Sequence, residues 1–216
     1  MSLAYQTDFI DLCVRHGVLR FGSFNLKSGR ESPYFFNAGL FNDGAAIAAV
    51  GRAYAAAVTA SGVEFDMLFG PAYKGIPLVT ITAAALAQYE GRNVPFAFNR
   101  KEAKDHGEGG DIIGSPLSGR VLIVDDVITA GTAIRESIDV IRAAGAQAAG
   151  VLLALDRQER APESRLSAVQ EVRRLYEIPV ITVVNLADLM HHMSLQGRSD
   201  DLVRMQAYRE RYGLAD

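Results

Sequence analysis

The sequence has few of the features that mark exported, membrane-spanning or nucleic-acid-binding proteins. Its single cysteine, Cys13, excludes an intramolecular disulfide, and we expect a buried thiol in a protein of the reducing cytoplasm. No run of 18 apolar residues occurs and no basic region precedes an apolar stretch near residue 1, so we expect neither a membrane span nor a signal peptide. With 22 Lys and Arg against 25 Asp and Glu, the chain lacks the excess positive charge that binds nucleic-acid phosphates.

Five short apolar runs form the dominant pattern of the chain. They begin about 27 to 30 residues apart, which is the length of a strand-helix-strand unit. The runs do not alternate polar with apolar residues, so they suit strands buried on both faces of a parallel sheet covered by helices. We therefore expect an α/β fold with an open parallel five-stranded sheet flanked by helices. The predicted strands are residues 66–70, 94–99, 121–126, 150–156 and 180–184.

The segments outside this pattern differ in character. A helix that ends near Gly17 precedes a strand, residues 28–41 indicate a strand pair around a turn, and residues 44–58 indicate a helix. At 216 residues the chain suits a single domain. We divide this domain, 1–216, into a small N-terminal cap subdomain (1–63), the core sheet (64–185) and a C-terminal helical tail (186–216).

Two adjacent acidic residues, Asp125 and Asp126, end the third predicted strand. Ligands bind beyond the carboxyl ends of the strands in open parallel sheets, so we expect both side chains to face a ligand. The residues that follow, 127–132, combine hydroxyl groups with Gly131, which can adopt a positive φ, and they lead into a predicted helix whose amino end favours an anion. Carboxylates suit ribose hydroxyls or Mg²⁺ rather than phosphate. Together, the acidic pair and the residues that follow it predict a ribose phosphate site. Either of these two parts alone is also compatible with ordinary turn and N-cap residues.

The stretch VLIVDDVITAGTA, residues 121–133, resembles the phosphoribosyl diphosphate motif of the type I phosphoribosyltransferases. Four further segments make the resemblance specific to orotate phosphoribosyltransferases: 24–41, 69–78, 98–110 and 155–160. The resemblance implies the type I phosphoribosyltransferase fold and transfer of the phosphoribosyl group from 5-phospho-α-D-ribose 1-diphosphate to orotate, giving orotidine 5′-phosphate and pyrophosphate in pyrimidine biosynthesis. It also implies a cytoplasmic homodimer that uses Mg²⁺ carried by the diphosphate, near Asp125 and Asp126, rather than by a protein cluster.

Residues 98–110 mix basic, acidic and glycine residues after the second predicted strand. Composition alone also suits a solvated charged loop, but the glycines favour a mobile loop, and a departing pyrophosphate needs cations around it. The resemblance implies that the basic residues contact phosphoribosyl diphosphate, with Lys101 and its loop partly supplied by the neighbouring subunit. We expect Lys104 to have the strongest effect on catalysis, and proton donation by Lys104 or His106 is left open. The predicted catalytic residues are Arg100, Lys101, Lys104, His106 and Asp126.

Residues 70–77 follow the first predicted strand. Gly70, Pro71 and Gly75 predict a sharp loop whose amides can face pyrophosphate, although a plain Gly/Pro turn with an incidental lysine is the alternative. The resemblance assigns Tyr73 and Lys74 to phosphoribosyl diphosphate. With the segments above and Lys27, the residues predicted to bind this substrate are Lys27, Tyr73, Lys74, Arg100, Lys101, Lys104, His106, Asp125, Asp126, Val127, Ile128, Thr129, Ala130, Gly131, Thr132 and Ala133.

Orotate differs from uracil by a carboxylate, which a planar guanidinium binds through two parallel hydrogen bonds. Arg157 follows the fourth predicted strand and is predicted to make this contact, although pairing with a surface acid is the alternative. Adjacent aromatics on a strand point to opposite faces, so at least one of Phe35 and Phe36 is expected in the core. The resemblance nevertheless assigns orotate to Phe35, Phe36, Thr129 and Arg157. Glu159 and Arg160 are expected at the surface.

Two other functions are compatible with the phosphoribosyl diphosphate motif. One is a phosphoribosyltransferase for another nucleobase, against which Arg157 and the Phe35–Phe36 pair argue. The other is a non-catalytic regulator that senses phosphoribosyl diphosphate and binds nucleic acid, against which the acidic charge balance argues. His16, His191 and His192 have no spacing typical of a metal site, so we expect no metal held mainly by protein.

Overall fold

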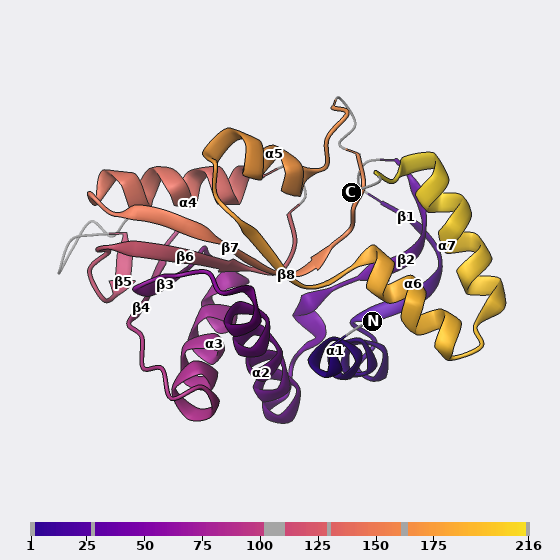
Figure 1. Ribbon diagram of the computed structural model, residues 1–216, viewed down its shortest axis with the longest axis horizontal. Helices are drawn as coiled ribbons and strands as arrows, with labels where there is room; N and C mark the ends of the chain where they lie inside the picture. The colour runs from indigo at the N-terminus through magenta and orange to yellow at the C-terminus, as the bar shows by residue number, and fades with distance from the viewer. Residues whose placement is uncertain (1–2, 27–28, 102–110, 129–130, 161–163, 215–216) are drawn as a thin grey trace.

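A six-stranded sheet forms the centre of the computed structural model, which describes residues 3–26, 29–101, 111–128, 131–160 and 164–214 (Figure 1). The strand order is β5-β4-β3-β6-β7-β8, and every neighbouring pair is parallel except β4 and β5. The strands are β3 (Met67–Gly70), β4 (Phe96–Asn99), β5 (Ile112–Gly114), β6 (Arg120–Asp125), β7 (Gln147–Asp156) and β8 (Val180–Asn185). The five predicted parallel strands are confirmed. β5 is an additional antiparallel edge strand, too short for an apolar pattern to reveal it.

Helices cover both faces of this sheet, as the continuous apolar runs predict. In Figure 1, α2 (Gly44–Ser61) and α3 (Gly75–Tyr89) lie below the sheet, and α4 (Thr132–Ala143) and α5 (Ala168–Tyr176) lie above it. Alternate residues of β6 enter the two resulting cores: Leu122 and Val124 pack on the α2–α3 side, and Val121 and Ile123 on the α4–α5 side. All four are fully buried.

An antiparallel hairpin stands beside the sheet and is formed by β1 (Leu19–Asn25) and β2 (Glu31–Phe36). The predicted strand pair within residues 28–41 is wrong, because only β2 lies there and its partner precedes the turn. The turn is closed by hydrogen bonds from Leu26 N to Arg30 O and from Gly29 N to Leu26 O, both 2.9 Å long. After β2 the chain forms a short 3-10 helix, η1 (Ala38–Leu40), instead of a second strand.

The remaining helices surround this hairpin and one end of the sheet. They are α1 (Ala4–Arg15), α6 (Leu186–Leu195) and α7 (Ser199–Tyr212). α7 lies along the hairpin in Figure 1, and its Tyr208 ring meets the Tyr34 ring of β2 edge-on, with centroids 6.4 Å apart. α2 packs on α3 and the sheet rather than on the hairpin. Among the helices described, none has the length and apolar character needed to span a membrane.

Candidate active site

Asp125 and Asp126 lie at the carboxyl end of β6 with little solvent exposure, 8% and 5% respectively. The backbone around them is held firmly. Tyr54 of α2 donates its hydroxyl to the Asp125 carbonyl at 3.0 Å, and the Asp126 carbonyl accepts from Ala154 N of β7 at 2.9 Å. The Asp126 amide donates to Oδ1 of Asp125 at 2.8 Å. The acidic pair is therefore a fixed part of the sheet edge.

A cavity of about 580 Å³ opens beside this pair. Three predicted segments meet around it: the loop after β3, Lys101 shortly after β4, and the chain from the end of β6 into α4. Its lining residues are Pro71, Ala72, Tyr73, Lys74, Lys101, Asp125, Asp126, Val127, Ile128, Gly131, Thr132, Ala133 and Ile134. Residues far apart in the chain, which the sequence predicts to bind the ligand, thus lie together at the carboxyl edge of the sheet.

The loop after β3 is compact because two glycines permit close backbone contacts. A Cβ atom on Gly70 would lie 2.3 Å from the carbonyl oxygen of Gly75, which no ordinary contact allows. Gly75 N donates to Pro71 O at 2.9 Å, and Ala72 N donates to Oδ1 of Asn99 at 2.8 Å. The peptide bond between Ala72 and Tyr73 is cis. The close contacts and hydrogen bonds of this loop place Lys74, the residue before α3, against the acidic pair.

Lys74 joins the loop to the acidic pair, since its Nζ lies 2.6 Å from Oδ2 of Asp126. Burial raises the pKa of the Asp125 carboxyl to about 7, and the neighbouring Asp126 carboxylate adds to that rise. The Asp126 amide and the Lys74 ammonium oppose it. Two carboxyl groups with one ammonium between them suit a ligand that donates hydroxyl hydrogens on one side and presents anionic oxygens on the other.

The amino end of α4 forms the opposite side of the cavity. Gly131 is the N-cap, with φ 71°, and it has no side chain that could accept hydrogen bonds from the first amides of the helix. α2, α5 and α6 differ, because Asp43, Ser167 and Asn185 cap them with side-chain oxygens. The uncapped amides and the positive end of the helix dipole at Thr132 and Ala133 suit a phosphate.

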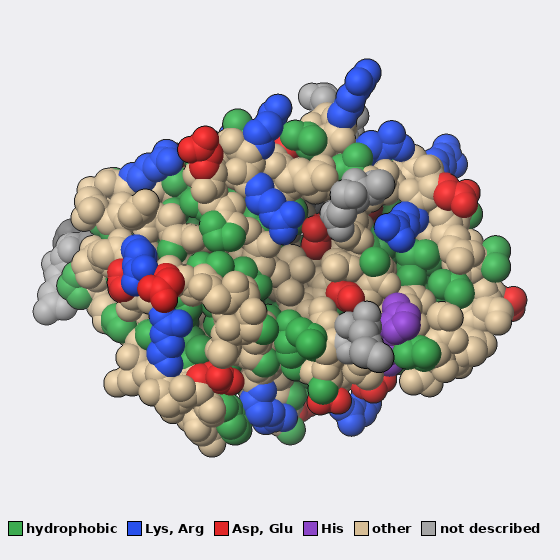
Figure 2. Space-filling view, in the orientation of Figure 1, with side chains coloured by type: hydrophobic (Ala, Val, Ile, Leu, Met, Phe, Trp, Pro, Cys, Tyr) green, Lys and Arg blue, Asp and Glu red, His purple; other side chains and the backbone are tan. Residues whose placement is uncertain are grey.

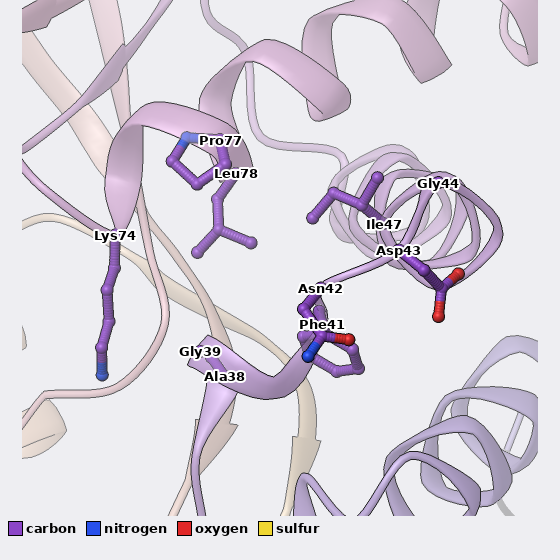
Figure 3. A pocket seen from close by; sticks show the side chains of 10 residues that line it. All are labelled: Ala38, Gly39, Phe41, Asn42, Asp43, Gly44, Ile47, Lys74, Pro77 and Leu78. Carbon is purple, nitrogen blue, oxygen red and sulfur yellow. The ribbon is translucent and has the colours of Figure 1, made fainter.

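A second hollow, of about 380 Å³, lies on the other side of Lys74 (Figure 3). Figure 3 shows Lys74 at one margin, with Pro77 and Leu78 of α3 and Ile47 of α2 forming an apolar wall. Lys74 borders both hollows, so its alkyl chain separates the polar cavity from this apolar one. The sequence contains no signal for this second hollow.

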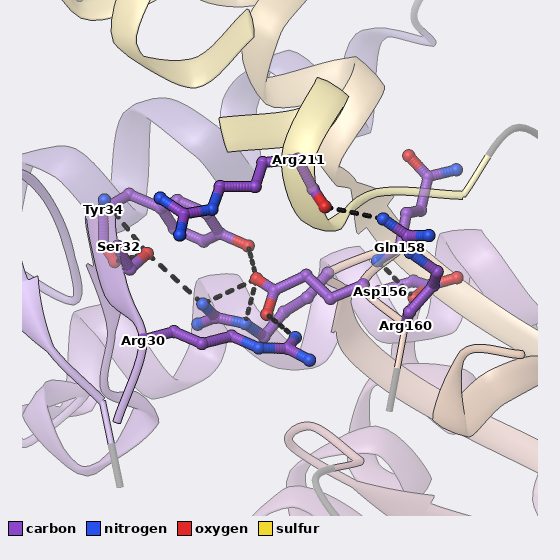
Figure 4. A network of polar contacts seen from close by, with 9 residues as sticks. Arg30, Ser32, Tyr34, Asp156, Gln158, Arg160 and Arg211 are labelled. Atoms are coloured by element: carbon purple, nitrogen blue, oxygen red, sulfur yellow. Dashed lines mark hydrogen bonds and ion pairs between the residues drawn. The ribbon is translucent and has the colours of Figure 1, made fainter. Parts of the chain in front are cut away.

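Arg157 belongs to a polar network between the end of β7 and strand β2 (Figure 4). Its Nε and Nη2 each lie 2.8 Å from Oε1 of Glu159, and its guanidinium lies 4.5 Å from the centre of the Tyr34 ring. The expectation that Glu159 lies at the surface is wrong, because its side chain is only 11% exposed.

The chain turns after Arg157 toward β2 and α7. Gln158 has a positive φ of 51°, and Glu159 forms an isolated β-bridge with Gly213. Arg160 is exposed, as expected.

Phe35 and Phe36 lie on opposite faces of β2, as expected for neighbours on a strand. Phe35 stacks on Phe24 with centroids 5.6 Å apart, and Arg20 lies over both rings. Phe36 packs against the α2–α3 core. Neither ring borders the 580 Å³ cavity, so their contact with orotate stays a prediction.

Comparisons with known proteins place the chain in a family. The phosphoribosyl transferase domain family matches residues 39–183. Across 211 residues the chain is 61% identical to the orotate phosphoribosyltransferase of Thioalkalivibrio sulfidiphilus, covering 97% of this chain and 99% of that one. The chain belongs to the orotate phosphoribosyltransferase family. It is also 60% identical to the orotate phosphoribosyltransferase of Stutzerimonas stutzeri, over 98% of this chain and 99% of the relative.

The fold agrees with this assignment to the orotate phosphoribosyltransferases. The crystal structure of the Francisella tularensis orotate phosphoribosyltransferase superposes with a TM-score of 0.88 at 42% identity, covering 96% of this chain and 100% of that one. The type I phosphoribosyltransferase fold is therefore confirmed, and the chain is an enzyme of the pentosyltransferase class.

Several of the predicted site residues fall outside the part of the chain that the structure describes. They are Lys27, Lys104, His106, Thr129 and Ala130. Arg100 and Lys101 are described: Arg100 N donates to Asp111 O at 2.7 Å, and Nζ of Lys101 lies 5.4 Å from the centre of the exposed Tyr73 ring. Within the described residues, no group of three or more His, Cys, Asp and Glu side chains could hold a metal ion.

Sequence reasoning missed three residues that shape the site: Tyr54, Asn99 and Glu159. Asn99 ends β4, so the rule that ligands gather at carboxyl ends would have found it. Glu159 lies two residues after Arg157 and was a detectable candidate for pairing with it. No sequence signal marked Tyr54, because its role depends on how α2 packs on the sheet.

Proposed function

We propose that this chain transfers the 5-phosphoribosyl group of phosphoribosyl diphosphate to orotate, yielding orotidine 5′-phosphate and pyrophosphate in pyrimidine biosynthesis. The observation that carries the proposal is the 580 Å³ cavity, which has a buried acidic pair on one side and uncapped helix amides on the other. A ribose phosphate complements both sides, because its hydroxyls donate to carboxylates and its 5′-phosphate accepts from amides.

The proposed chemistry needs no covalent enzyme intermediate. The bond from C1′ to the diphosphate oxygen breaks, pyrophosphate leaves with the electron pair, and an orotate nitrogen that has lost its proton bonds to C1′. Positioning and charge stabilisation then supply most of the rate. Asp125 and Asp126 hold the ribose hydroxyls, residues 129–133 hold the 5′-phosphate, and the amides of Tyr73 and Lys74 face the diphosphate.

Cations around the leaving group are the second requirement. Lys74 and Lys101 both border the cavity and supply two of them. The segment 98–110 contributes Arg100, Lys104 and His106, and we propose that it closes over the diphosphate. We propose further that the enzyme is a cytoplasmic homodimer in which part of this loop comes from the neighbouring subunit.

Mg²⁺ is the proposed cofactor, bound mainly through the oxygens of the diphosphate. The carboxylate oxygens of Asp125 and Asp126 suit a hard cation, but Asp126 is already paired with Lys74. The donor set therefore fits a cation that arrives with the substrate and touches the protein through few ligands. When bound, it neutralises charge on the departing pyrophosphate.

Arg157 is the proposed reader of the orotate carboxylate, with Phe35, Phe36, Lys27 and Thr129 around the pyrimidine. Its place after β7, next to β6 in the sheet, supports this role because the two strands end at the same edge. A nucleic-acid-binding sensor has less support, since the described Lys and Arg side chains are interspersed with acids on the face in Figure 2.

Ultraviolet absorbance tests the proposal directly. Orotate consumption should require both phosphoribosyl diphosphate and Mg²⁺, while uracil, hypoxanthine and adenine should react far more slowly. Asp126→Asn, which keeps the side-chain shape, should abolish most of the turnover. Preferential use of another base would assign the chain a different substrate, and binding of phosphoribosyl diphosphate without turnover of any base would indicate a sensor.

A further inference from the structure

Glu159 contacts Arg157, Tyr34 and Arg30, and Figure 4 draws the polar network to which these contacts belong. Its Oε1 accepts from Nε of Arg157 at 2.8 Å and from the Tyr34 hydroxyl at 3.2 Å. Its Oε2 lies 3.7 Å from Nη1 of Arg30. The carboxylate thus joins Arg157, which follows β7, to donors from β2 and from the residue before β2, which are distant from it in the chain. Such a contact fixes the position of Arg157 relative to the hairpin.

The short contacts of the Arg157 guanidinium lie on one edge. Nε and Nη2 face Glu159, and Nη2 also lies 3.4 Å from Oγ of the buried Ser32. One face of the group lies on the Tyr34 ring. In the described part of the chain, Nη1 has no hydrogen-bond acceptor. A carboxylate ligand can therefore make two parallel hydrogen bonds with Nη1 and Nη2 by replacing only the long contact between Nη2 and Ser32.

The charges of this network favour one further anion. Arg30 and Arg157 bring two positive charges, and Glu159 brings one negative charge, so the three side chains keep one net positive charge. All three are poorly exposed, with side-chain values of 16%, 20% and 11% respectively. Tyr34 stays a neutral donor, because burial raises its pKa well above the usual value. A single carboxylate would neutralise the network.

We infer that Glu159 is a positioning residue, which holds the guanidinium of Arg157 so that its Nη1–Nη2 edge reads the orotate carboxylate. The inference rests on the proposed function and adds to it a residue that contacts Arg157 and is not itself proposed to contact either substrate. Without the Glu159 carboxylate, the arginine keeps its charge but loses the two contacts that set its orientation. The consequence should therefore be confined to orotate and should not extend to phosphoribosyl diphosphate.

Glu159→Gln is the direct test, because it removes the charge and nearly preserves the shape. We expect the KM for orotate to rise by about tenfold, while the KM for phosphoribosyl diphosphate stays within about twofold. The matched control is Glu64→Gln, which removes an exposed carboxylate paired with Arg120 at 3.1 Å. That control should change neither KM. A role in folding alone would not separate the two KM values.

Tyr34→Phe provides a second variant, since it removes only the hydroxyl that donates to Glu159. It should raise the KM for orotate by about threefold, and it carries the test if Glu159→Gln does not fold. An unchanged KM for orotate, or equal rises in both KM values, overturns the inference. The kinetics of Arg157→Ala distinguish failure of the positioning role of Glu159 from failure of the proposed function. If wild-type turnover depends on Arg157 but not on Glu159, only the positioning role fails; if orotate is not a substrate, both fail.

Discussion

Nζ of Lys74 lies 2.6 Å from Oδ2 of Asp126, and this ion pair joins the loop after β3 to the end of β6. The two partners differ in exposure, with the Lys74 side chain 55% exposed and the Asp126 side chain 8% exposed. In the proposed reaction Lys74 faces the diphosphate and Asp126 faces a ribose hydroxyl. When the substrate binds, the contact between Lys74 and Asp126 is replaced by two contacts, one from Lys74 to the diphosphate and one from a ribose hydroxyl to Asp126. The positive charge of Lys74 then stabilises the diphosphate.

Lys74→Ala should therefore weaken binding of phosphoribosyl diphosphate and slow turnover, because the leaving group loses a cation. We expect kcat/KM for this substrate to fall by about 100-fold. Steady-state kinetics at saturating orotate measure the effect. Arg174→Ala, at an exposed position of α5, is the control for loss of a positive charge and should leave kcat/KM unchanged. A comparable loss in the control would show that net charge, rather than the Lys74 contact, sets the rate.

The raised pKa of Asp125 predicts how stability changes with pH. In the folded chain this carboxyl titrates near pH 7, whereas in the unfolded chain it titrates near its usual 3.8. The folded state thus binds more protons between these values, and the stability from this group is lost as pH rises through 7. We expect the unfolding free energy to fall by on the order of 1 to 3 kcal/mol between pH 5 and pH 8 relative to Asp125→Asn.

Thermal or urea unfolding of the ligand-free protein at several pH values measures this difference. The other charged groups near Asp125 are Asp126 and Lys74, and both remain in the variant, so the comparison reports the proton bound by the Asp125–Asp126 pair. Parallel stability curves for the two proteins would mean that Asp125 is ionised in the folded state throughout this range.

The sheet and its functional edge follow closely from the sequence, because both depend on local patterns. The apolar run before Asp125 predicts a buried strand. Because Asp125 and Asp126 stand at the end of that strand, they lie at the carboxyl edge of the sheet, whichever strands pair with it. Glu159 shows what such patterns omit. Its contact with Tyr34 joins residues 125 positions apart, and it exists only because the hairpin stands against the end of β7. The sequence alone cannot reveal that approach.

Gly70→Ala tests whether the compact loop after β3 needs its glycines. The new Cβ would lie 2.3 Å from Gly75 O and 2.6 Å from Cγ1 of Val79, and neither the loop nor α3 can yield easily. We expect a loss of roughly 3 kcal/mol in unfolding free energy and little remaining activity. Gly44→Ala is the matched control, because no atom lies within 4 Å of its added Cβ. Chemical denaturation of both variants should show a stable control, and equal stabilities would contradict the close packing described here.

Arg157→Ala tests the assignment of the carboxylate reader. Loss of the guanidinium should raise the KM for orotate by at least about tenfold and leave the KM for phosphoribosyl diphosphate nearly unchanged. The variant also leaves the buried Glu159 with fewer partners, so its melting temperature should be recorded beside the kinetics. Equal weakening of both substrates would indicate a general disturbance of the site and remove the assignment.

Lys104 is the last residue to test, because it carries both the proposed catalytic role and the proposed sharing of the loop. Lys104→Ala should lower kcat by more than about tenfold with the fold intact, since a cation near the departing pyrophosphate is lost. If the loop crosses to the neighbouring subunit, a hybrid of one Lys104→Ala chain and one Asp126→Ala chain has one site with both defects and one with neither. Because one of its two sites is intact, such a hybrid should show about half of the wild-type activity. Tagged chains purified as confirmed hybrids provide the measurement, and a hybrid as inactive as its parents means that each chain supplies its own Lys104.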